Sequence, residues 1–294
     1  MHFWQLTIKA EANIVDELTD FLFELGAVSI TFTDAGSNPI FEPSAHSDVI
    51  WESNYITTLF DDTTDAESTL IKLTQQYPSC LADCHLEQLR EQAWERACLD
   101  QFEAMRFGQR LWICPSWATP PDPTAVNITL DPGLAFGTGT HPTTSLCLEW
   151  LDAHPPLNQT VLDYGSGSGI LAIAAAKLGA RAIWAVDNHD QALLATRDNA
   201  KRNHISATQL KVVSPEDLPQ IIADLLIANI LALPLIELAS QLVSYVKPGG
   251  YIVLSGILSE QSQMIIDTYS QYMSIESIQE SAEWVRIVGI RLPQ

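Results

Sequence analysis

The chain has 294 residues, about 1.5 to 2 ordinary domains' worth, of which 47% are hydrophobic and 17% charged. This composition supports a sizeable buried core and excludes a disordered chain, and no apolar run reaches the roughly 18 residues that a membrane span requires. Thirty-six acidic residues against 15 Lys and Arg give a net charge of −21, which disfavours nucleic acid as a direct partner.

The same charge suits a cationic partner, although acidity also serves simply to keep a protein soluble, and the two explanations stay open on charge alone. The N-terminus lacks a basic stretch followed by an apolar one, so we expect a cytoplasmic protein without a secretory signal. Cys80, Cys84 and His85 lie close together, but a zinc site would need a second ligand pair. We therefore expect reduced thiols and no metal.

The first 86 residues predict a small α+β domain. Residues 3–10 alternate as a half-buried strand, residues 11–25 have helical spacing, and Gly26 ends that helix. The rest of this region predicts strands near 28–32 and 54–60, a helix ended by Pro78, and a last strand within 80–88. The order β-α-β-β-α-β is that of the ferredoxin-like split motif. Because no catalytic pattern is visible in it, we expect this domain, residues 1–86, to dock a substrate.

Residues 87–106 contain a stretch of helical composition and are expected to form a helical linker. Residues 107–294 then begin with two short strands, 111–114 and 125–130, and continue with a regular alternation of strands and helices. The alternation predicts helices between strands at 160–164, 181–187, 209–213, 222–228 and 251–255. The stretches 274–280 and 284–291 suit an antiparallel hairpin at the sheet edge. This rhythm predicts an α/β domain with a mostly parallel, doubly wound sheet.

The densest local signal is the glycine-rich stretch that follows the strand at 160–164. Gly165, Gly167 and Gly169 let the backbone turn sharply and approach a ligand, and the next helix offers free amide hydrogens. Asp163 precedes them, where its carboxylate can accept bonds from a cationic amine or from loop amides. The third glycine of the dinucleotide fingerprint would fall on Ile170, which counts against a nicotinamide enzyme.

Two polar residues stand at the ends of later strands. Asp187 is placed to accept both hydroxyls of a ribose, a feature shared by dinucleotide binders and methyltransferases. Asn229 ends the strand at 222–228, at the edge where ligands of open α/β sheets bind. Its carboxamide can accept a hydrogen bond from an amine and orient the lone pair for in-line attack. The alternative is that Asn229 caps the helix that begins near Pro234 or closes a turn.

The second dense signal is the loop and helix start in residues 130–151. Gly133, Gly137 and Gly139 make a flexible loop that could fold over a bound cofactor as a lid. Thr140 or His141 can cap a helix whose first position is Pro142. Thr143 and Thr144 in its first turn would direct hydroxyls and amides towards the cofactor. His141 either deprotonates an incoming ammonium or supports the loop.

Taken together, LDPGLAFGTGTHPTT, VLDYGSGSGILAIAAAKLGA, AVDNHDQAL, RDNAKRN and ANILALPL resemble the methyltransferases of large-subunit ribosomal protein eleven, the PrmA family. The C-terminal WVRIVGIR also fits, and the similarity spans essentially the whole chain. Ser166 stands where the family often has Cys, a change that leaves the turn intact.

The resemblance implies a substrate-recognition domain, a flexible helical linker and a Rossmann-like class I methyltransferase domain with a mostly parallel seven-stranded sheet. It also implies trimethylation of the α-amine and lysine amines of that basic ribosomal protein, with S-adenosylmethionine as cofactor. No oligomerisation seam can be singled out in the sequence, so we expect a monomer. Carried over residue by residue, the cofactor contacts fall on Thr144, Gly165, Asp187 and Asn229. Gly167, Thr143 and Asp163 lie beside them and complete the predicted cofactor site, while Asn229 and His141 are the catalytic candidates.

Three other functions stay in view. Methyltransferases that act on a glutamine amide or a nucleic acid base usually have a proline pair and an aromatic ring after this Asn, whereas this chain has Ile230, Leu231 and Ala232. A non-catalytic module that only binds S-adenosylmethionine would not need Asn229 or the loop at 130–151. A nicotinamide oxidoreductase is disfavoured by Ile170. Protein amine methylation is therefore the leading hypothesis.

Overall fold

The computed structural model describes residues 3–36, 51–61, 64–78, 84–89, 103–131 and 141–293. The chain divides into two compact units, residues 1–97 and residues 98–294. Each unit has a hydrophobic core of its own, and each is described here by itself. Among the described residues, no helix is long and apolar enough to cross a membrane.

The first unit has the element order β-α-β-β-α-β that the sequence predicts. Its elements are β1 (Phe3–Glu11), a short 3-10 turn (Ala12–Ile14), α1 (Val15–Glu24), β2 (Ala27–Asp34), β3 (Ser53–Asp61), α2 (Ala66–Gln76) and β4 (His85–Leu89). The strands form an antiparallel sheet in the order β2-β3-β1-β4. Gly26 follows α1 with a φ of 99°, the left-handed conformation that ends many helices.

The alternation along β1 explains which face of this sheet is buried. Leu6, Ile8 and Ala10 are buried together with residues of α1, whereas Thr7 and Lys9 between them are only partly covered. A strand places successive side chains on opposite faces, so one face carries the core and the other is polar. The metal reading of this region rests partly on Cys80, which lies outside the described residues.

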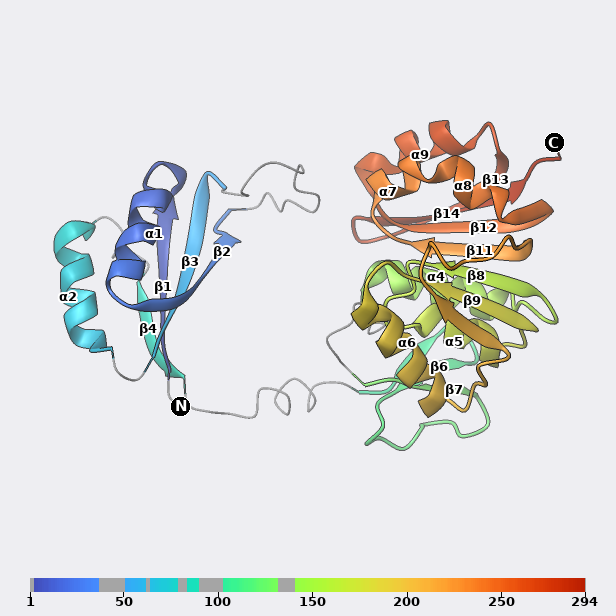
Figure 1. Cartoon of the computed structure of the whole chain (residues 1–294), viewed down its shortest axis with the longest axis horizontal. Coiled ribbons are helices and arrows are strands. Elements are labelled where there is room, and N and C mark those ends of the chain that lie inside the picture. The colour runs from blue at the N-terminus through green and yellow to red at the C-terminus, as the bar shows by residue number, and fades with distance from the viewer. Residues whose placement is uncertain are drawn as a thin grey trace. The chain divides into compact units, whose positions relative to one another are not determined.

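The second unit is built on a seven-stranded sheet. Its strands are β8 (Thr160–Tyr164), β9 (Ala182–Val186), β10 (Leu210–Val213), β11 (Ala223–Asn229), β12 (Val246–Leu258), β13 (Met273–Ser281) and β14 (Trp284–Arg291). The order is β10-β9-β8-β11-β12-β14-β13. The strands from β10 to β12 pair in parallel, and β14 is antiparallel to both of its neighbours, β12 and β13. The predicted C-terminal hairpin is confirmed, with β14 inserted between β12 and β13 (Figure 1).

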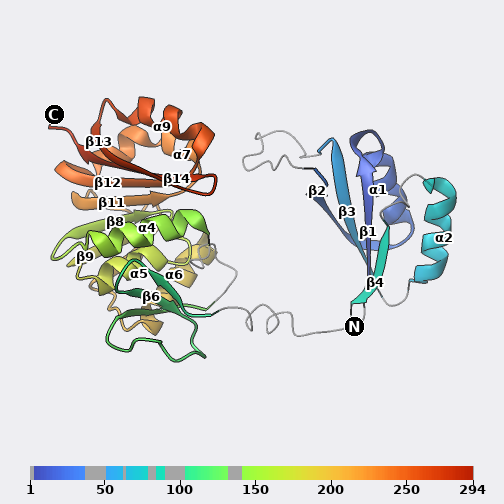
Figure 2. The same cartoon turned by 180° about the vertical axis from the view of Figure 1, so that it is seen from behind.

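Helices cover both faces of this sheet, as Figures 1 and 2 show from opposite sides. The first set is α4 (Pro142–Ala153), α5 (Ile170–Lys177) and α6 (Asp190–Arg202), and the second is α7 (Ala232–Glu237), α8 (Ala239–Ser244) and α9 (Ser262–Tyr269). Val161 of β8 belongs to the core under the first set, and Leu162 to the core under the second. The parallel strands are apolar on both faces for this reason, and the doubly wound α/β fold is confirmed.

A three-stranded sheet packs against the core under α4 and α5. It consists of β5 (Met105–Phe107), β6 (Leu111–Cys114) and β7 (Val126–Thr129), in the order β5-β6-β7. Phe107, Leu111 and Ile128 join the core of the large sheet. The sequence predicts the second and third of these strands, but it assigns residues 105–106 to the linker. The predicted start of the linker is also wrong, because residues 87–89 belong to β4, and residues 90–102 lie outside the described residues.

The prediction of a helix between successive strands is wrong between β10 and β11. Residues 214–222 join β10 to β11 without a helix and contain a turn closed by a bond from the Asp217 amide to the Ser214 carbonyl. Only nine residues separate the two strands, which is shorter than the 10 to 12 residues that a crossover with a helix needs. The connection instead runs past the carboxyl end of β9 and places Pro215 against the cavity described next.

Candidate functional site

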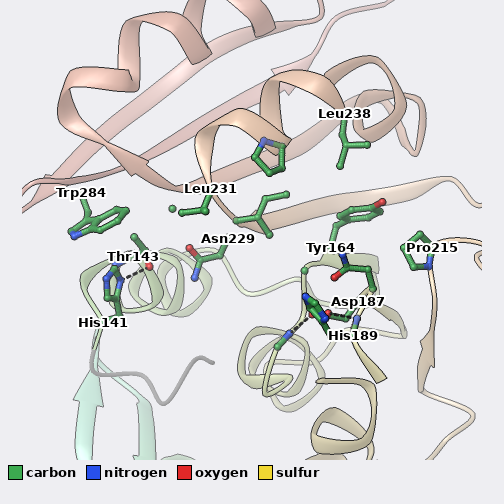
Figure 3. Close-up of a pocket in the computed structure, with 16 residues that line it drawn as sticks. His141, Thr143, Tyr164, Asp187, His189, Pro215, Asn229, Leu231, Leu238 and Trp284 are labelled. Carbon is green, nitrogen blue, oxygen red and sulfur yellow. Dashed lines mark hydrogen bonds between the residues drawn. The ribbon is translucent and has the colours of Figure 1, made fainter. Parts of the chain in front are cut away.

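A cavity of about 600 Å³ opens at the carboxyl ends of β8, β9 and β11, where ligands of open α/β sheets bind. Figure 3 shows that the labelled lining residues gather at two ends of this cavity. Trp284, His141 and Thr143 gather at one end, which we call the aromatic end. Asp187 and its neighbours Tyr164, His189, Pro215 and Leu238 form the other, which we call the acidic end. Asn229 and Leu231 lie between them.

The acidic end is organised by backbone amides. Asp187 follows β9 and is 8% exposed; its Oδ2 accepts a bond from the Gly167 amide at 2.9 Å, and its Oδ1 accepts from the His189 amide at 3.0 Å. Each carboxylate oxygen has a second lone pair, so the group can still accept two further donors. Because Gly165 and Gly167 also line the cavity, a ligand here meets the glycine-rich loop and the carboxylate together.

The loop after β11 is held between two glycines. A side chain at Gly165 (φ +83°) would collide with the Ile230 side chain, and one at Gly256 (φ +84°) would collide with the Ile230 carbonyl. Both positions therefore require glycine, for the positive φ and for the close approach of Ile230. This packing fixes the residue after Asn229 and thereby the direction in which the β11 carboxyl end faces the cavity.

Asn229 has a partner on α4. Its Nδ2 donates to Thr144 Oγ1 at 3.3 Å, and the side chain lines the cavity midway between the two ends (Figure 3). Helix α7 begins after Leu231 and has no side-chain cap, so the alternative in which Asn229 caps that helix is wrong. With the amide nitrogen bound to Thr144, the carboxamide oxygen is the atom left to accept a bond from a ligand.

His141 caps α4, as the sequence allows, with Pro142 as the first residue of the helix. Its Nδ1 lies 2.7 Å from Thr143 Oγ1 and accepts weakly from the Thr143 amide at 3.4 Å. The ring also packs edge-on against Trp284, with centroids 4.8 Å apart. Burial lowers the pKa of His141 below its usual value, so the imidazole is neutral at physiological pH.

Asp163 lies beneath the glycine-rich loop and does not line the cavity. It is 1% exposed; its Oδ2 accepts from the Ala172 amide at 2.9 Å, and its Oδ1 has no partner among the described residues. Of the two roles that the sequence allows for Asp163, the structure shows the bond to a backbone amide. Burial raises the pKa of Asp163 to about 7, and the nearby Asp187 carboxylate adds to this effect against the opposing bond from Ala172.

We expect Asp163→Asn to change how the stability of the second unit depends on pH. The folded pKa of Asp163 exceeds the unfolded one, so the contribution of this group to stability is fully present below about pH 4 and is lost as pH rises towards 7, by roughly 1 kcal/mol per pH unit. The neutral amide of the variant does not titrate, so the stability of the variant should increase relative to that of the wild type between pH 5 and 7. Hydrogen exchange of β8 and α5 peptides, compared at equal pH, measures this difference in stability. A constant difference, or the same trend in the exposed Asp198→Asn control, would contradict the assignment.

The structure adds lining residues that the sequence did not single out. They are Tyr164, Asn188, His189, Pro215, Ile230, Leu231, Pro234, Leu238, Gly256 and Trp284. Tyr164, Asn188 and His189 adjoin predicted residues and could have been found from that proximity. Trp284 and Gly256 come from β14 and β12, and only the strand order brings them to the cavity. Residues 132–140, most of the predicted lid, lie outside the described residues.

The cavity can hold a nucleoside-sized ligand in one orientation. Asp187 is the single carboxylate among the described lining residues, and those residues include no Lys or Arg. A ligand with vicinal hydroxyls would therefore find its acceptor at the acidic end, and its other part would extend past Asn229 towards the aromatic end. An ammonium that reached the aromatic end would meet no charged partner among these residues, a setting that favours its neutral form.

Comparison with known proteins gives one consistent result. The family model described as "Ribosomal protein L11 methyltransferase (PrmA)" matches residues 2–291. Two relatives described as "Ribosomal protein L11 methyltransferase" are each 48% identical: one from Pseudomonas fluorescens (strain SBW25), over 99% of this chain and 100% of its own, and one from Nitrosococcus oceani, over 98% of each chain. The crystal structure of a ribosomal protein L11 methylase from Lactobacillus delbrueckii subsp. bulgaricus is similar with a TM-score of 0.60 and 34% identity, over 65% of this chain and 100% of that one.

Proposed function

The chain belongs to the PrmA family of ribosomal protein L11 methyltransferases, and on that premise we propose that it methylates amines of ribosomal protein L11 with S-adenosylmethionine as cofactor. We further propose that the acceptors are the N-terminal α-amine and lysine side-chain amines, each carried to the trimethylated state. The observation that supports this best is the cavity with Asp187 at one end, Asn229 in the middle and an uncharged aromatic end.

The residues of the acidic end fit the nucleoside part of S-adenosylmethionine. Asp187 would accept bonds from both ribose hydroxyls, and the glycine-rich loop at Gly165 and Gly167 would hold the amino acid part. Thr143 and Thr144 in the first turn of α4 would help to place that part. When bound, the cofactor supplies an electrophilic methyl group on its sulfonium. Asp163 stays beneath the loop and supports it through the Ala172 amide.

The aromatic end would receive the acceptor amine. In the first two methyl transfers, where the neutral amine still carries an N–H, Asn229 Oδ1 accepts a bond from it and orients its lone pair towards the methyl group. The Asn229 amide nitrogen is bound to Thr144, which leaves Oδ1 for this contact. The uncharged surroundings favour the deprotonated amine. Leu231 and Trp284 would pack against the aliphatic part of a lysine side chain. One end thus binds the donor and the other the acceptor.

We propose that His141 acts here by holding the start of α4 rather than as a base, because its Nδ1 is engaged with Thr143. On this basis we expect His141→Ala to lower kcat by roughly tenfold, while His141→Asn, which keeps a strong helix cap, should retain most activity. Methyl transfer rates measured from pH 6 to 9 test this. If both variants lose activity equally and the acidic limb of the pH profile disappears, His141 is the base.

The first unit would dock the substrate. We propose that the first unit, which includes β4, forms the recognition domain, that the second unit is the catalytic domain, and that the chain between β4 and β5 serves as the linker. A linker lets one catalytic site reach several amines on one docked protein. The net charge of −21 would speed its encounter with a basic ribosomal protein and disfavour direct nucleic acid binding. We expect a monomer.

The decisive experiment is to mix the purified chain with S-adenosylmethionine and free ribosomal protein L11 and record the intact substrate mass. Mass gains in whole methyl units, assigned by fragmentation to the α-amine and lysines, would support the proposal. No gain, with cofactor binding measured by calorimetry, would retain the cofactor and reject the substrate. Label that entered RNA or DNA but not protein would favour a base methyltransferase, and binding without any turnover would favour a sensing module.

A further inference from the structure

Arg286 is a buried cation on β14 that the site described above does not use. It is 4% exposed, and among the described residues no carboxylate lies within ion-pair distance of it. Burying a cation without an acidic partner is costly, and here neutral acceptors provide the bonds that offset the cost. It is two residues after Trp284 on β14, so the two side chains lie on the same face of that strand.

The guanidinium joins two elements to β14. Its Nη1 donates to the Leu146 carbonyl of α4 at 2.8 Å, and its Nη2 donates to Gln279 Oε1 of β13 at 3.0 Å. The planar fork of an arginine fixes both directions at once, which a single lysine ammonium would not do. Arg286 therefore ties α4 to the strand on which Trp284 stands.

The first turn of α4 and the start of β14 together build the aromatic end. Thr144 of that turn holds Asn229, and His141 at its cap packs on Trp284. Ser255 adds a weaker link, because its hydroxyl lies 3.4 Å from the Thr143 carbonyl and 3.1 Å from the Val285 carbonyl. A shift of α4 against β14 would thus move the acceptor-binding residues relative to one another while Asp187 stays in place.

We propose that Arg286 is a positioning residue for methyl transfer, acting through the first turn of α4 on Asn229 and on the aromatic end. This inference rests on the proposed function. It predicts that a change at Arg286 lowers kcat and weakens the binding of S-adenosylmethionine much less, because Asp187 and the glycine-rich loop do not depend on α4.

The same strand offers a matched control. Arg291 is also buried, at 9% exposure, donates through Nη1 to the Val246 carbonyl of β12, and has a buried Nε without a partner, as Arg286 does. No bond between Arg291 and α4 is found among the described residues. Arg286→Met and Arg291→Met should therefore lose comparable stability, and only the first should disturb the aromatic end.

The experiment measures kcat and the KM for each substrate with the full-length chain and ribosomal protein L11, after the folded fraction has been matched by circular dichroism. We expect Arg286→Met to lower kcat roughly tenfold and Arg286→Lys to restore part of it, with Arg291→Met within about threefold of the wild type. Gln279→Ala, at an exposed side chain, should show a smaller loss in the same direction even if Arg286→Met does not fold. Equal kcat in Arg286→Met and wild type, or equal loss in Arg291→Met, overturns the proposal.

A second readout does not depend on the substrate. Hydrogen exchange of the first turn of α4 should be faster in Arg286→Met than in Arg291→Met, and equal exchange in the two variants would also overturn the proposal. If the wild type itself fails to methylate ribosomal protein L11, the proposed function is rejected. The exchange comparison then still decides whether Arg286 fixes α4.

Discussion

Replacing Asn229 with alanine is expected to lower kcat for methyl transfer about 100-fold, with the affinity for S-adenosylmethionine changed by no more than a few-fold. Asn229 lies between the two ends of the cavity, and its Nδ2 is bound to Thr144 Oγ1 at 3.3 Å. The carboxamide oxygen is thereby oriented to accept from the attacking amine. Without it the amine still enters but is no longer aligned, and misalignment is costly in a reaction that needs an in-line approach.

Two further variants separate alignment from simple loss of contact. Thr144→Val removes the acceptor that orients Asn229 but leaves the carboxamide, so we expect a smaller fall in kcat than in Asn229→Ala. Asn229→Asp introduces a carboxylate that stabilises the protonated amine, so we expect a low rate that rises at higher pH. Single-turnover rates and cofactor titrations test all three. An unchanged kcat in Asn229→Ala would remove this residue from the mechanism.

Asp187, Asn229 and the glycine-rich loop could be predicted because their signals are local. A strand followed by Gly165, Gly167 and Gly169 predicts a loop at the carboxyl end of that strand, and Asp187 and Asn229 end strands of the same parallel sheet. Since parallel strands have their carboxyl ends at one edge, these residues were expected to lie together, and the structure places them around one cavity.

Trp284 of the aromatic end could not be predicted in the same way, although His141 and Thr143 were. Trp284 reaches the cavity only because β14 lies between β12 and β13, and alternation along a strand does not specify the strand order. Arg286 is missed for the same reason: a strand at the sheet edge would leave a polar side chain exposed, whereas both faces of β14 are covered. Gly256 looks like an ordinary strand glycine in the sequence, and only the packing of Ile230 against it shows why glycine is required there. Each of these residues depends on long-range pairing.

Replacing Asp187 with alanine is expected to weaken binding of S-adenosylmethionine about 100-fold or more while leaving kcat at saturating cofactor nearly unchanged. Its carboxylate is held by the Gly167 and His189 amides and keeps one lone pair on each oxygen for a ribose hydroxyl. A hydrogen bond to a charged group contributes about 1.5–3 kcal/mol, so the loss of two such bonds corresponds to that factor. Asn229 and the aromatic end do not depend on this carboxylate.

The control must separate a lost ligand contact from a disturbed loop or a changed net charge. Asp198→Ala removes one charge from the exposed side of α6 and should bind the cofactor as the wild type does. Asp187→Asn keeps one acceptor oxygen of the same size and should fall between wild type and Asp187→Ala. Calorimetry with S-adenosylmethionine and with its 2′-deoxyribose analogue completes the test, because the analogue lacks one of the two donors. If the wild type binds both ligands equally, or if Asp187→Ala keeps the wild-type affinity, the ribose does not lie against Asp187.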